Sequence, residues 1–305
     1  LPIERRSHDT PPELSYAQQR LWFLDRFQPD SPFYNVPVAL YLTGELDRAA
    51  LAQSLTEITR RHEVLRTTFP IVAGEPVQFI APAASLVPVP DVITDEAAAQ
   101  LIAMPFSAIA LLEFLDVGRG DWIIQNAANG AVGKTLAMLA HSRGVHAVNL
   151  VRRDAGVDEL AAFGIENAVS TASPDWKAKV RAIIGDAPIR AAVDSVGGVA
   201  SNDLADLLGE NGLLVSFGTA AGKPMQIASG AVIFKQLTIK GFWGSKISAA
   251  MSADERRRLI EELIARVASG DVELPVEAAY DITEIAQAVK SSLTPGKAGK
   301  VLLKP

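Results

Sequence analysis

The sequence contains no cysteine, which excludes disulfide bonds, thiol nucleophiles and zinc sites built on thiolates. Histidine is scarce, and no two of the four histidines have a metal-ligand spacing on one helix face. No apolar run reaches the roughly 18 residues of a membrane-spanning helix. The first residues lack the apolar stretch of a secretory signal. We therefore expect a cytoplasmic protein that binds neither a membrane nor a metal ion.

Charge and length narrow the class further. The chain has 29 basic and 35 acidic residues, a net charge of −6, and this mildly acidic balance argues against nucleic acid as a partner. Its 305 residues suggest about two domains. Lysine is absent before Lys134 and occurs 11 times from there on. This asymmetry fits two segments of different origin.

The first segment, about residues 1–84, has the pattern of a small α+β unit. Ser15 is placed to cap a helix with an apolar face that includes Leu21 and Trp22. Residues 64–69 have the composition of a strand. The stretch from 80 to 90 is rich in proline and alanine, which suits a linker.

Two motifs in this segment resemble the opening motifs of nonribosomal peptide synthetase condensation domains. They are Ser-Tyr-Ala-Gln-Gln-Arg-Leu-Trp-Phe-Leu at 15–24 and Arg-His-Glu-Val-Leu-Arg-Thr-Thr-Phe at 61–69. The resemblance covers about the first fifth of such a domain and implies a carrier protein as an alternative partner. The family's catalytic pair of adjacent histidines does not occur in this sequence. Amide-bond formation therefore has no candidate general base.

The pattern changes after Asp121 to short apolar strands that alternate with helices. Helical crossovers between strands buried on both faces predict a doubly wound parallel sheet. We expect Ser173 to cap one crossover helix, and Gly209 or Gly212 to close the helix at 202–208. The six predicted strands are 122–125, 146–151, 168–170, 191–194, 213–217 and 236–241.

A glycine-containing loop follows the first of these strands and opens a helix. Gly130 lacks a side chain, so backbone there can approach a pyrophosphate, and Gly133 allows close packing of the helix on the strand. The free amides and the dipole of the helix attract phosphate. The candidate phosphate-binding residues are Asn129, Gly130, Ala131, Val132 and Gly133.

The residues that follow the second strand indicate whether the site binds NAD or NADP. An NAD site needs an acidic residue there, but Val151 is followed by Arg152 and Arg153, with Asp154 only after them. Two guanidinium groups suit a 2′-phosphate. The sequence therefore predicts NADPH as the cofactor.

Several runs together resemble the zinc-free medium-chain dehydrogenases/reductases, a family with a Rossmann coenzyme domain. The run 233–243, Ile-Phe-Lys-Gln-Leu-Thr-Ile-Lys-Gly-Phe-Trp, narrows the resemblance to the branch of 2-enoyl thioester reductases and quinone oxidoreductases. The match covers about residues 85–305. The other runs are 125–133, 149–153, 194–198 and 299–303.

This resemblance implies further contacts at the nicotinamide end of the coenzyme. They fall on Phe217, Gly218, Thr219, Ala220, Phe242, Trp243, Gly244 and Lys300. The two resemblances together imply three parts: a condensation-like fragment at 1–84, an NADP-binding domain at 85–271, and a segment at 272–305 that in the reductase family returns to a GroES-like catalytic domain.

Most of that catalytic domain has no counterpart in this sequence. None of the four tyrosines stands in the context of the family's catalytic tyrosine, so the catalytic residues stay unassigned. We expect an NADPH-dependent oxidoreductase that transfers hydride to the activated double bond of an enoyl thioester, with impaired activity and a homodimeric assembly. Alternatives are a quinone oxidoreductase, a non-catalytic NADP-binding module, and a peptide-synthetase fragment that docks a carrier protein.

Overall fold

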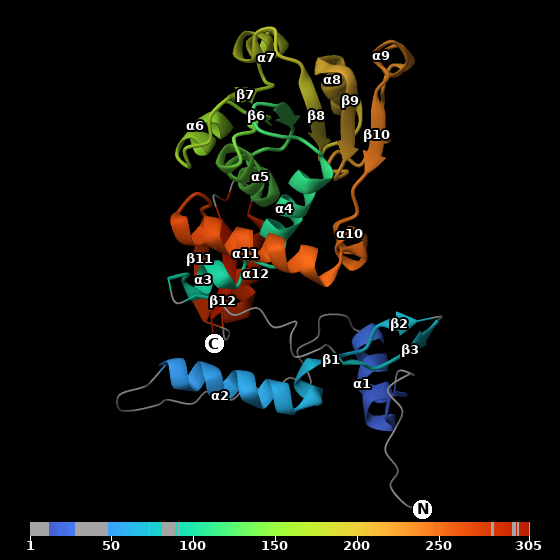
Figure 1. Ribbon diagram of the computed structural model, residues 1–305, viewed down its shortest axis with the longest axis vertical. Helices are drawn as coiled ribbons and strands as arrows, with labels where there is room; N and C mark the ends of the chain where they lie inside the picture. The colour runs from blue at the N-terminus through green and yellow to red at the C-terminus, as the bar shows by residue number, and fades with distance from the viewer. Residues whose placement is uncertain are drawn as a thin grey trace, which may run out of the picture. The chain divides into compact units, whose positions relative to one another are not determined.

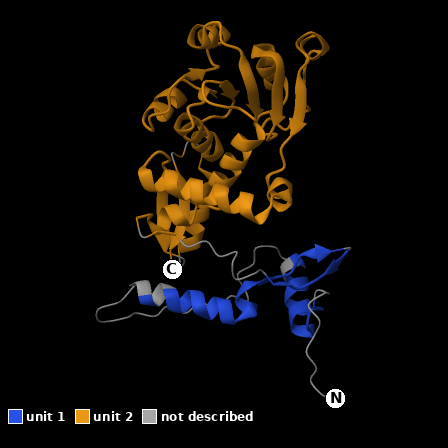
Figure 2. Ribbon diagram, viewed as in Figure 1, with its two compact units in different colours: residues 1–88 blue, residues 89–305 orange. Residues whose placement is uncertain are grey.

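The computed structural model divides into two compact units, residues 1–88 and 89–305, which are coloured separately in Figure 2. It describes residues 12–27, 48–72, 74–80, 89, 90, 92–281, 284–294, 297 and 299–304. The expected boundary at residue 271, between the NADP-binding domain and the C-terminal segment, stays a prediction.

Unit 1 is a small α+β structure. Its first helix begins as expected, because Gln18 N donates to Ser15 Oγ (3.3 Å) and Ser15 N donates to Gln18 Oε1 (2.8 Å). The apolar face of that helix is only partly covered, with Leu21 45% exposed. The elements are α1 (Tyr16–Phe27), α2 (Arg48–Arg61), the 3₁₀ turn η2 (Glu63–Arg66), β1 (Thr67–Thr68), β2 (Ile71–Val72), β3 (Glu75–Pro76) and β4 (Phe79–Ile80).

The strand predicted at 64–69 is wrong for most of its length. Residues 63–66 form the 3₁₀ turn, and the Thr67 hydroxyl donates to the Glu63 carbonyl oxygen (2.7 Å). This side-chain hydrogen bond competes with strand pairing. Only β1 is extended, and it pairs with β4 in antiparallel register.

Unit 2 contains the predicted doubly wound parallel sheet (Figure 1). Its six strands lie in the order β10-β9-β8-β5-β6-β7, and every pairing is parallel. The chain order reverses between β5 and β8, which is the switch point where such sheets bind ligands. The strands are β5 (Trp122–Gln125), β6 (His146–Val151), β7 (Ala168–Ser170), β8 (Ile189–Asp194), β9 (Leu208–Ser216) and β10 (Thr238–Gly241).

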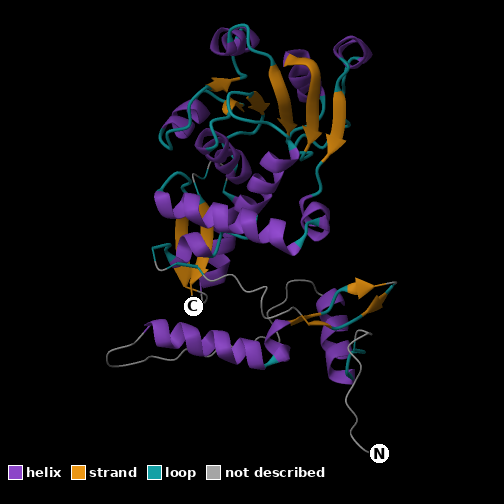
Figure 3. Cartoon of the chain, viewed as in Figure 1, coloured by secondary structure: helices purple, strands orange, loops and turns teal. Residues whose placement is uncertain are grey.

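Helices cover both faces of this sheet, as Figure 3 shows. Successive strand residues enter opposite cores: Ile123 packs with α4, α5 and α11, whereas Ile124 packs with α7 and α8. This explains why the strands are continuous apolar runs. The helices are α3 (Asp95–Ala98), α4 (Met104–Phe114), α5 (Ala131–Ser142), α6 (Ala155–Ala161), α7 (Trp176–Ile184), α8 (Val199–Leu207), α9 (Ser229–Lys235), α10 (Gly244–Ala250) and α11 (Ala253–Ser269).

Two predicted helix ends differ from the structure. Ser173 does not cap α7, because its hydroxyl donates to the carboxylate of Asp175 and the helix begins at Trp176. Gly209 and Gly212 do not close α8, because the chain enters β9 directly at Leu208. Leu208 is 2% exposed and pairs with Ile189, so burial in the sheet decides this boundary.

The end of the chain forms a separate βαβ element within unit 2. Strands β11 (Val276–Asp281) and β12 (Lys300–Lys304) are parallel neighbours, joined through α12 (Ile285–Leu293). Gly299 is required here, because a Cβ atom would lie 2.4 Å from the carbonyl oxygen of Pro275. The absence of a catalytic domain, expected from the sequence, stays a prediction.

No helix in the described part of the chain combines the length and apolar character needed to cross a membrane.

An ion network ties three helices of unit 2 together. Arg143, at the end of α5, binds Glu113 of α4 (2.6 Å) and Glu262 of α11 (2.8 Å). Arg258 of α11 also reaches Glu113 (2.9 Å) but is 53% exposed, against 22% for Arg143. Burial raises the pKa of Glu113, but hydrogen bonds from Arg258 and Arg143 outweigh it and leave the pKa below its usual value.

Replacement of Arg143 by methionine should lower the free energy of unfolding of unit 2 by about 2 kcal/mol, because two half-buried carboxylates lose their shared partner. The matched variant Arg258→Met should cost less than about 1 kcal/mol, since its ion pairs face solvent. Urea denaturation followed by tryptophan fluorescence measures both. Equal losses in the two variants would contradict the assignment.

Candidate functional site

The candidate site begins with the loop after β5, where the predicted phosphate-binding residues lie. Gly130 N donates to the Ala127 carbonyl oxygen (3.0 Å), which closes a turn just before α5. In the described part of the chain, the amides of Ala131 and Val132 contact no acceptor, and α5 has no side-chain cap. These amides lie at the positive end of a 12-residue helix, a geometry suited to an anion.

Gly133 has the close-packing role predicted for it, with a different neighbour. A Cβ atom there would lie 2.6 Å from the carbonyl oxygen of Ala128, so the helix packs against the loop rather than against the strand. Ala127 in the same loop has φ of 50°, a left-handed conformation that alanine rarely adopts. The tight loop geometry is therefore held by tertiary contacts.

A lysine lies behind this loop. Lys134 is 2% exposed and pairs with Glu159 of α6 (2.8 Å), and its ammonium nitrogen lies 4.6 Å from the ring centroid of Phe163. The other carboxylate oxygen of Glu159 accepts from Asn129 Nδ2 (3.2 Å). Glu159 of α6 thus holds both the Asn129 side chain of the loop and Lys134 in the first turn of α5.

The crevice at the switch point forms a cavity of about 400 Å³, here called the crevice cavity. The predicted residues Asn129, Arg152, Arg153 and Ala220 line it. Arg152 and Arg153 are exposed, and within the described residues neither forms an ion pair. Further lining residues include Asn126, Thr171, Trp176, Val196 and Asp203.

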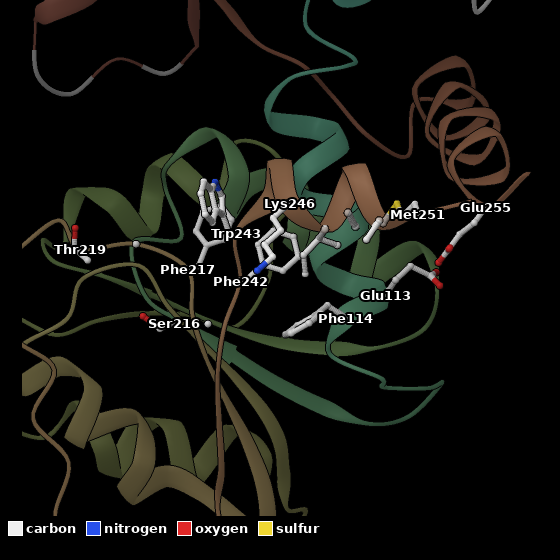
Figure 4. Close-up of a pocket in the computed structure, with 15 residues that line it drawn as sticks. Glu113, Phe114, Ser216, Phe217, Thr219, Phe242, Trp243, Lys246, Met251 and Glu255 are labelled. Carbon is white, nitrogen blue, oxygen red and sulfur yellow. The ribbon is translucent and has the colours of Figure 1, made fainter. Parts of the chain in front are cut away.

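A second cavity of about 890 Å³, here called the aromatic cavity, lies beyond the ends of β9 and β10. Figure 4 shows Phe217, Phe242, Trp243 and Lys246 gathered at its middle, with Thr219 toward one end. The rings of Phe217 and Phe242 are 5.7 Å apart, and Phe114 meets Phe242 edge-on at 5.4 Å. The titratable side chains that line this cavity are Glu113, Lys246 and Glu255.

A third cavity of about 740 Å³, here called the loop cavity, lies between the loop after β5 and the C-terminal βαβ element. Gly130 and Ala131 line it on one side, and Lys300 lines it on the other. It shares Asn129 with the crevice cavity. The predicted residues therefore lie around three neighbouring cavities of unit 2, while Val132, Gly133, Asp154 and Gly244 line none of them.

The predicted set of site residues omitted several that line these cavities. Thr171 and Trp176 follow β7, and Val196 follows β8, so each lies beyond the carboxyl end of a parallel strand. That position is a signal readable from the sequence, since ligands bind at these ends in open parallel sheets. Lys246 had no comparable signal, because α10 is placed by its packing with α4.

Comparisons with known proteins found one family model that matches the N-terminal part of the chain and another that matches unit 2. Residues 131–265 match the zinc-binding dehydrogenase family model, and residues 10–99 match the condensation domain model. The resemblance predicted from the sequence is confirmed. The chain has no cysteine, so it has no thiolate ligands for zinc. No group of three or more candidate metal ligands occurs in its described residues.

Individual relatives follow the same division. The Arabidopsis thaliana mitochondrial enoyl-[acyl-carrier-protein] reductase is 31% identical over 188 residues, which is 60% of this chain and 50% of that protein. This chain therefore spans half the length of that relative. A linear gramicidin synthase of Brevibacillus parabrevis is 56% identical over 80 residues, 26% of this chain and 2% of that protein.

A solved structure agrees with the fold of unit 2. A Bacillus thuringiensis protein assigned as an NADPH:quinone reductase superposes with a TM-score of 0.66 at 26% identity, over 76% of this chain and 70% of that one.

One buried carboxylate stands out electrostatically. Asp194, at the end of β8, is fully buried. Burial raises its pKa, but hydrogen bonds from the amides of Gly197 and Val196 and from the side chains of Ser201 and Asn126 outweigh it, and the pKa is lowered below 3.8.

Because its pKa is lower in the folded protein, Asp194 stabilises the fold above pH 3.8, and this contribution is lost as the pH falls through the native value. The variant Asp194→Asn lacks the charge at every pH. The difference in unfolding free energy between the two proteins should be constant from about pH 5 to 7 and shrink below about pH 4. Urea titrations at about pH 6 and pH 3.5 measure it, and a difference that grows in acid would contradict the assignment.

Proposed function

We propose that unit 2 binds NADPH and works as an oxidoreductase that reduces the activated double bond of an enoyl thioester. The observation that carries this proposal is the crevice cavity, where the loop at the start of α5 and the Arg152–Arg153 pair border one space at the switch point. Similarity to an enoyl-[acyl-carrier-protein] reductase and to an assigned NADPH:quinone reductase supports it.

The residues of the site fit the cofactor. The open amide of Ala131, which lines the adjoining loop cavity, would bind the pyrophosphate, with that of Val132 behind it in the first turn of α5. The two guanidinium groups that line the crevice cavity would bind the 2′-phosphate through charge-assisted hydrogen bonds. Trp176 offers an aromatic side wall beside Thr171 for the adenine ring. The partial positive charge of the loop and the two arginines together match an anionic ligand.

At the other end, Phe217, Gly218 and Thr219 would place the nicotinamide at the mouth of the aromatic cavity. Bound NADPH supplies a hydride. The rings of Phe114, Phe217 and Phe242 would offer an apolar surface for an acyl group at that end. Lys300 reaches the loop cavity from the opposite side and can screen the negative charge of a phosphate.

Quinone reduction is the second candidate, favoured by the same aromatic walls, because offset or edge-on ring contacts suit a planar quinone. Four other expectations stay predictions: docking of a carrier protein, a non-catalytic NADP-binding role, a homodimeric assembly and a cytoplasmic location. Weak turnover also stays a prediction. Its support is that no tyrosine lines the described aromatic cavity to donate the proton that completes the reduction.

Fluorescence titration should show that the protein binds NADPH at least about tenfold more tightly than NADH, because the two arginines pair with the 2′-phosphate. The double variant Arg152→Ala/Arg153→Ala should abolish that preference and leave NADH binding unchanged. Arg190→Ala, on an exposed residue of β8, is the matched control. Equal affinity of the unmodified protein for both coenzymes would overturn the cofactor assignment.

Turnover with NADPH is measured on a short enoyl thioester and on a small benzoquinone, by loss of NADPH absorbance. We expect slow but detectable oxidation with the thioester, and a lower rate with the quinone. A faster quinone reaction would move the assignment to the second candidate. NADPH binding without turnover on either substrate would support the non-catalytic role.

A further inference from the structure

The buried carboxylate of Asp194 holds two loops of the crevice together. Its Oδ1 accepts hydrogen bonds from Asn126 Nδ2 (2.7 Å), which follows β5, and from the amides of Val196 and Gly197 (3.0 Å each), which follow β8. The Asn126 side chain makes a second contact between the same loops, because its Oδ1 accepts from Ser195 N (2.7 Å). The two loops are thus joined by side chains rather than by strand pairing.

The backbone of the same residue holds a third loop. The carbonyl oxygen of Asp194 accepts from the amides of Phe217 (2.8 Å) and Gly218 (3.1 Å), which follow β9. The fit is tight at that point, because a Cβ atom on Gly218 would lie 2.8 Å from the carbonyl oxygen of Ser195. Asp194 therefore joins the loops after β5, β8 and β9.

Each of these loops borders the proposed cofactor site. Asn126 and Val196 line the crevice cavity, and Phe217 and Gly218 line the aromatic cavity. Asp194 lines neither cavity and is fully buried, so it acts only through the groups it holds. Hydrogen bonds to a buried charge are worth more than neutral ones, and such a network fixes its members in one arrangement.

We propose that Asp194 is the positioning residue that sets the spacing between the phosphate loop and the nicotinamide-side loops. This inference rests on the proposed function. It assigns the carboxylate a role in how the cofactor is held, beyond its contribution to folding.

The residues that would bind the adenosine half of NADPH lie outside the loops that Asp194 joins, so binding to the two parts of the site can be compared. Arg152, Arg153, Thr171 and Trp176 follow β6 and β7, and the Asp194 carboxylate contacts none of them. A ligand that occupies only this half does not need the loops that Asp194 joins. NADPH spans both halves and does need them.

The experiment compares the full-length protein with Asp194→Asn, which keeps the shape of the side chain and removes its charge. Dissociation constants are measured by calorimetry for NADPH and for adenosine 2′-monophosphate, which carries the adenosine and its 2′-phosphate but no pyrophosphate. We expect the NADPH constant to rise about tenfold or more in the variant, as loss of hydrogen bonds to a charged group predicts. The constant for adenosine 2′-monophosphate should change less than about twofold.

Ser201→Ala is the matched control. The Ser201 hydroxyl also donates to Asp194, through Oδ2, but Ser201 lies on α8 and lines none of the three cavities. This variant should lower the melting temperature and leave both dissociation constants within about twofold. Asn126→Ala serves as a second test should Asp194→Asn fold poorly, and the double variant should be non-additive in NADPH binding.

The outcomes are distinct. An unchanged NADPH constant in both Asp194→Asn and Asn126→Ala overturns the positioning role. Equal losses for NADPH and adenosine 2′-monophosphate, in step with a lower melting temperature, also overturn it and leave Asp194 a purely structural residue. Failure of the unmodified protein to bind either ligand overturns the proposed function itself.

Discussion

The crevice of unit 2 depends on one buried negative charge at the end of a central strand. Asp194 receives four side-chain or backbone donors on its carboxylate and two more amides on its carbonyl oxygen. A carboxylate without such partners would be too costly to bury. The donors therefore determine both that the charge is tolerated and how the loops that supply them are placed.

The charges around this crevice are arranged in two layers. The outer layer consists of exposed guanidinium groups and the amide end of α5, which match an anionic ligand. The inner layer consists of buried charges that have partners: Lys134 is paired with Glu159 behind the loop, and the Asp194 carboxylate accepts hydrogen bonds from neutral donors. Positive charge is thus left where a ligand can reach it, while the buried charges fix the backbone.

The two units differ in how much apolar surface they cover. The second unit has two continuous cores, one on each face of the sheet. Among the described residues of unit 1, Leu14 is the only apolar residue that is buried. The match to the condensation domain model covers most of unit 1, and the match to the dehydrogenase model lies within unit 2.

The strands β5 to β8 of unit 2 were predictable because both of their faces are buried, which requires unbroken apolar runs. The strands β5, β6 and β7 have the expected bounds. Boundaries set by distant partners were not predictable. Leu208, for example, joins β9 through its pairing with Ile189. Local hydrogen bonds changed other boundaries: the Ser173 hydroxyl donates to the carboxylate of Asp175, so it does not cap α7. In unit 1, the expected strand gives way to a turn that the Thr67 hydroxyl closes.

The same division holds for the candidate site. Local spacing after β5 and β6 was enough to predict the glycine-containing loop and the arginine pair, because those features need only a strand end and the start of a helix. The sequence placed Asp194 in a family motif but could not show its partners, which come from residues 68 positions earlier and seven positions later. Only the folded sheet brings those donors to one carboxylate, because parallel strands distant in the sequence end at the same edge.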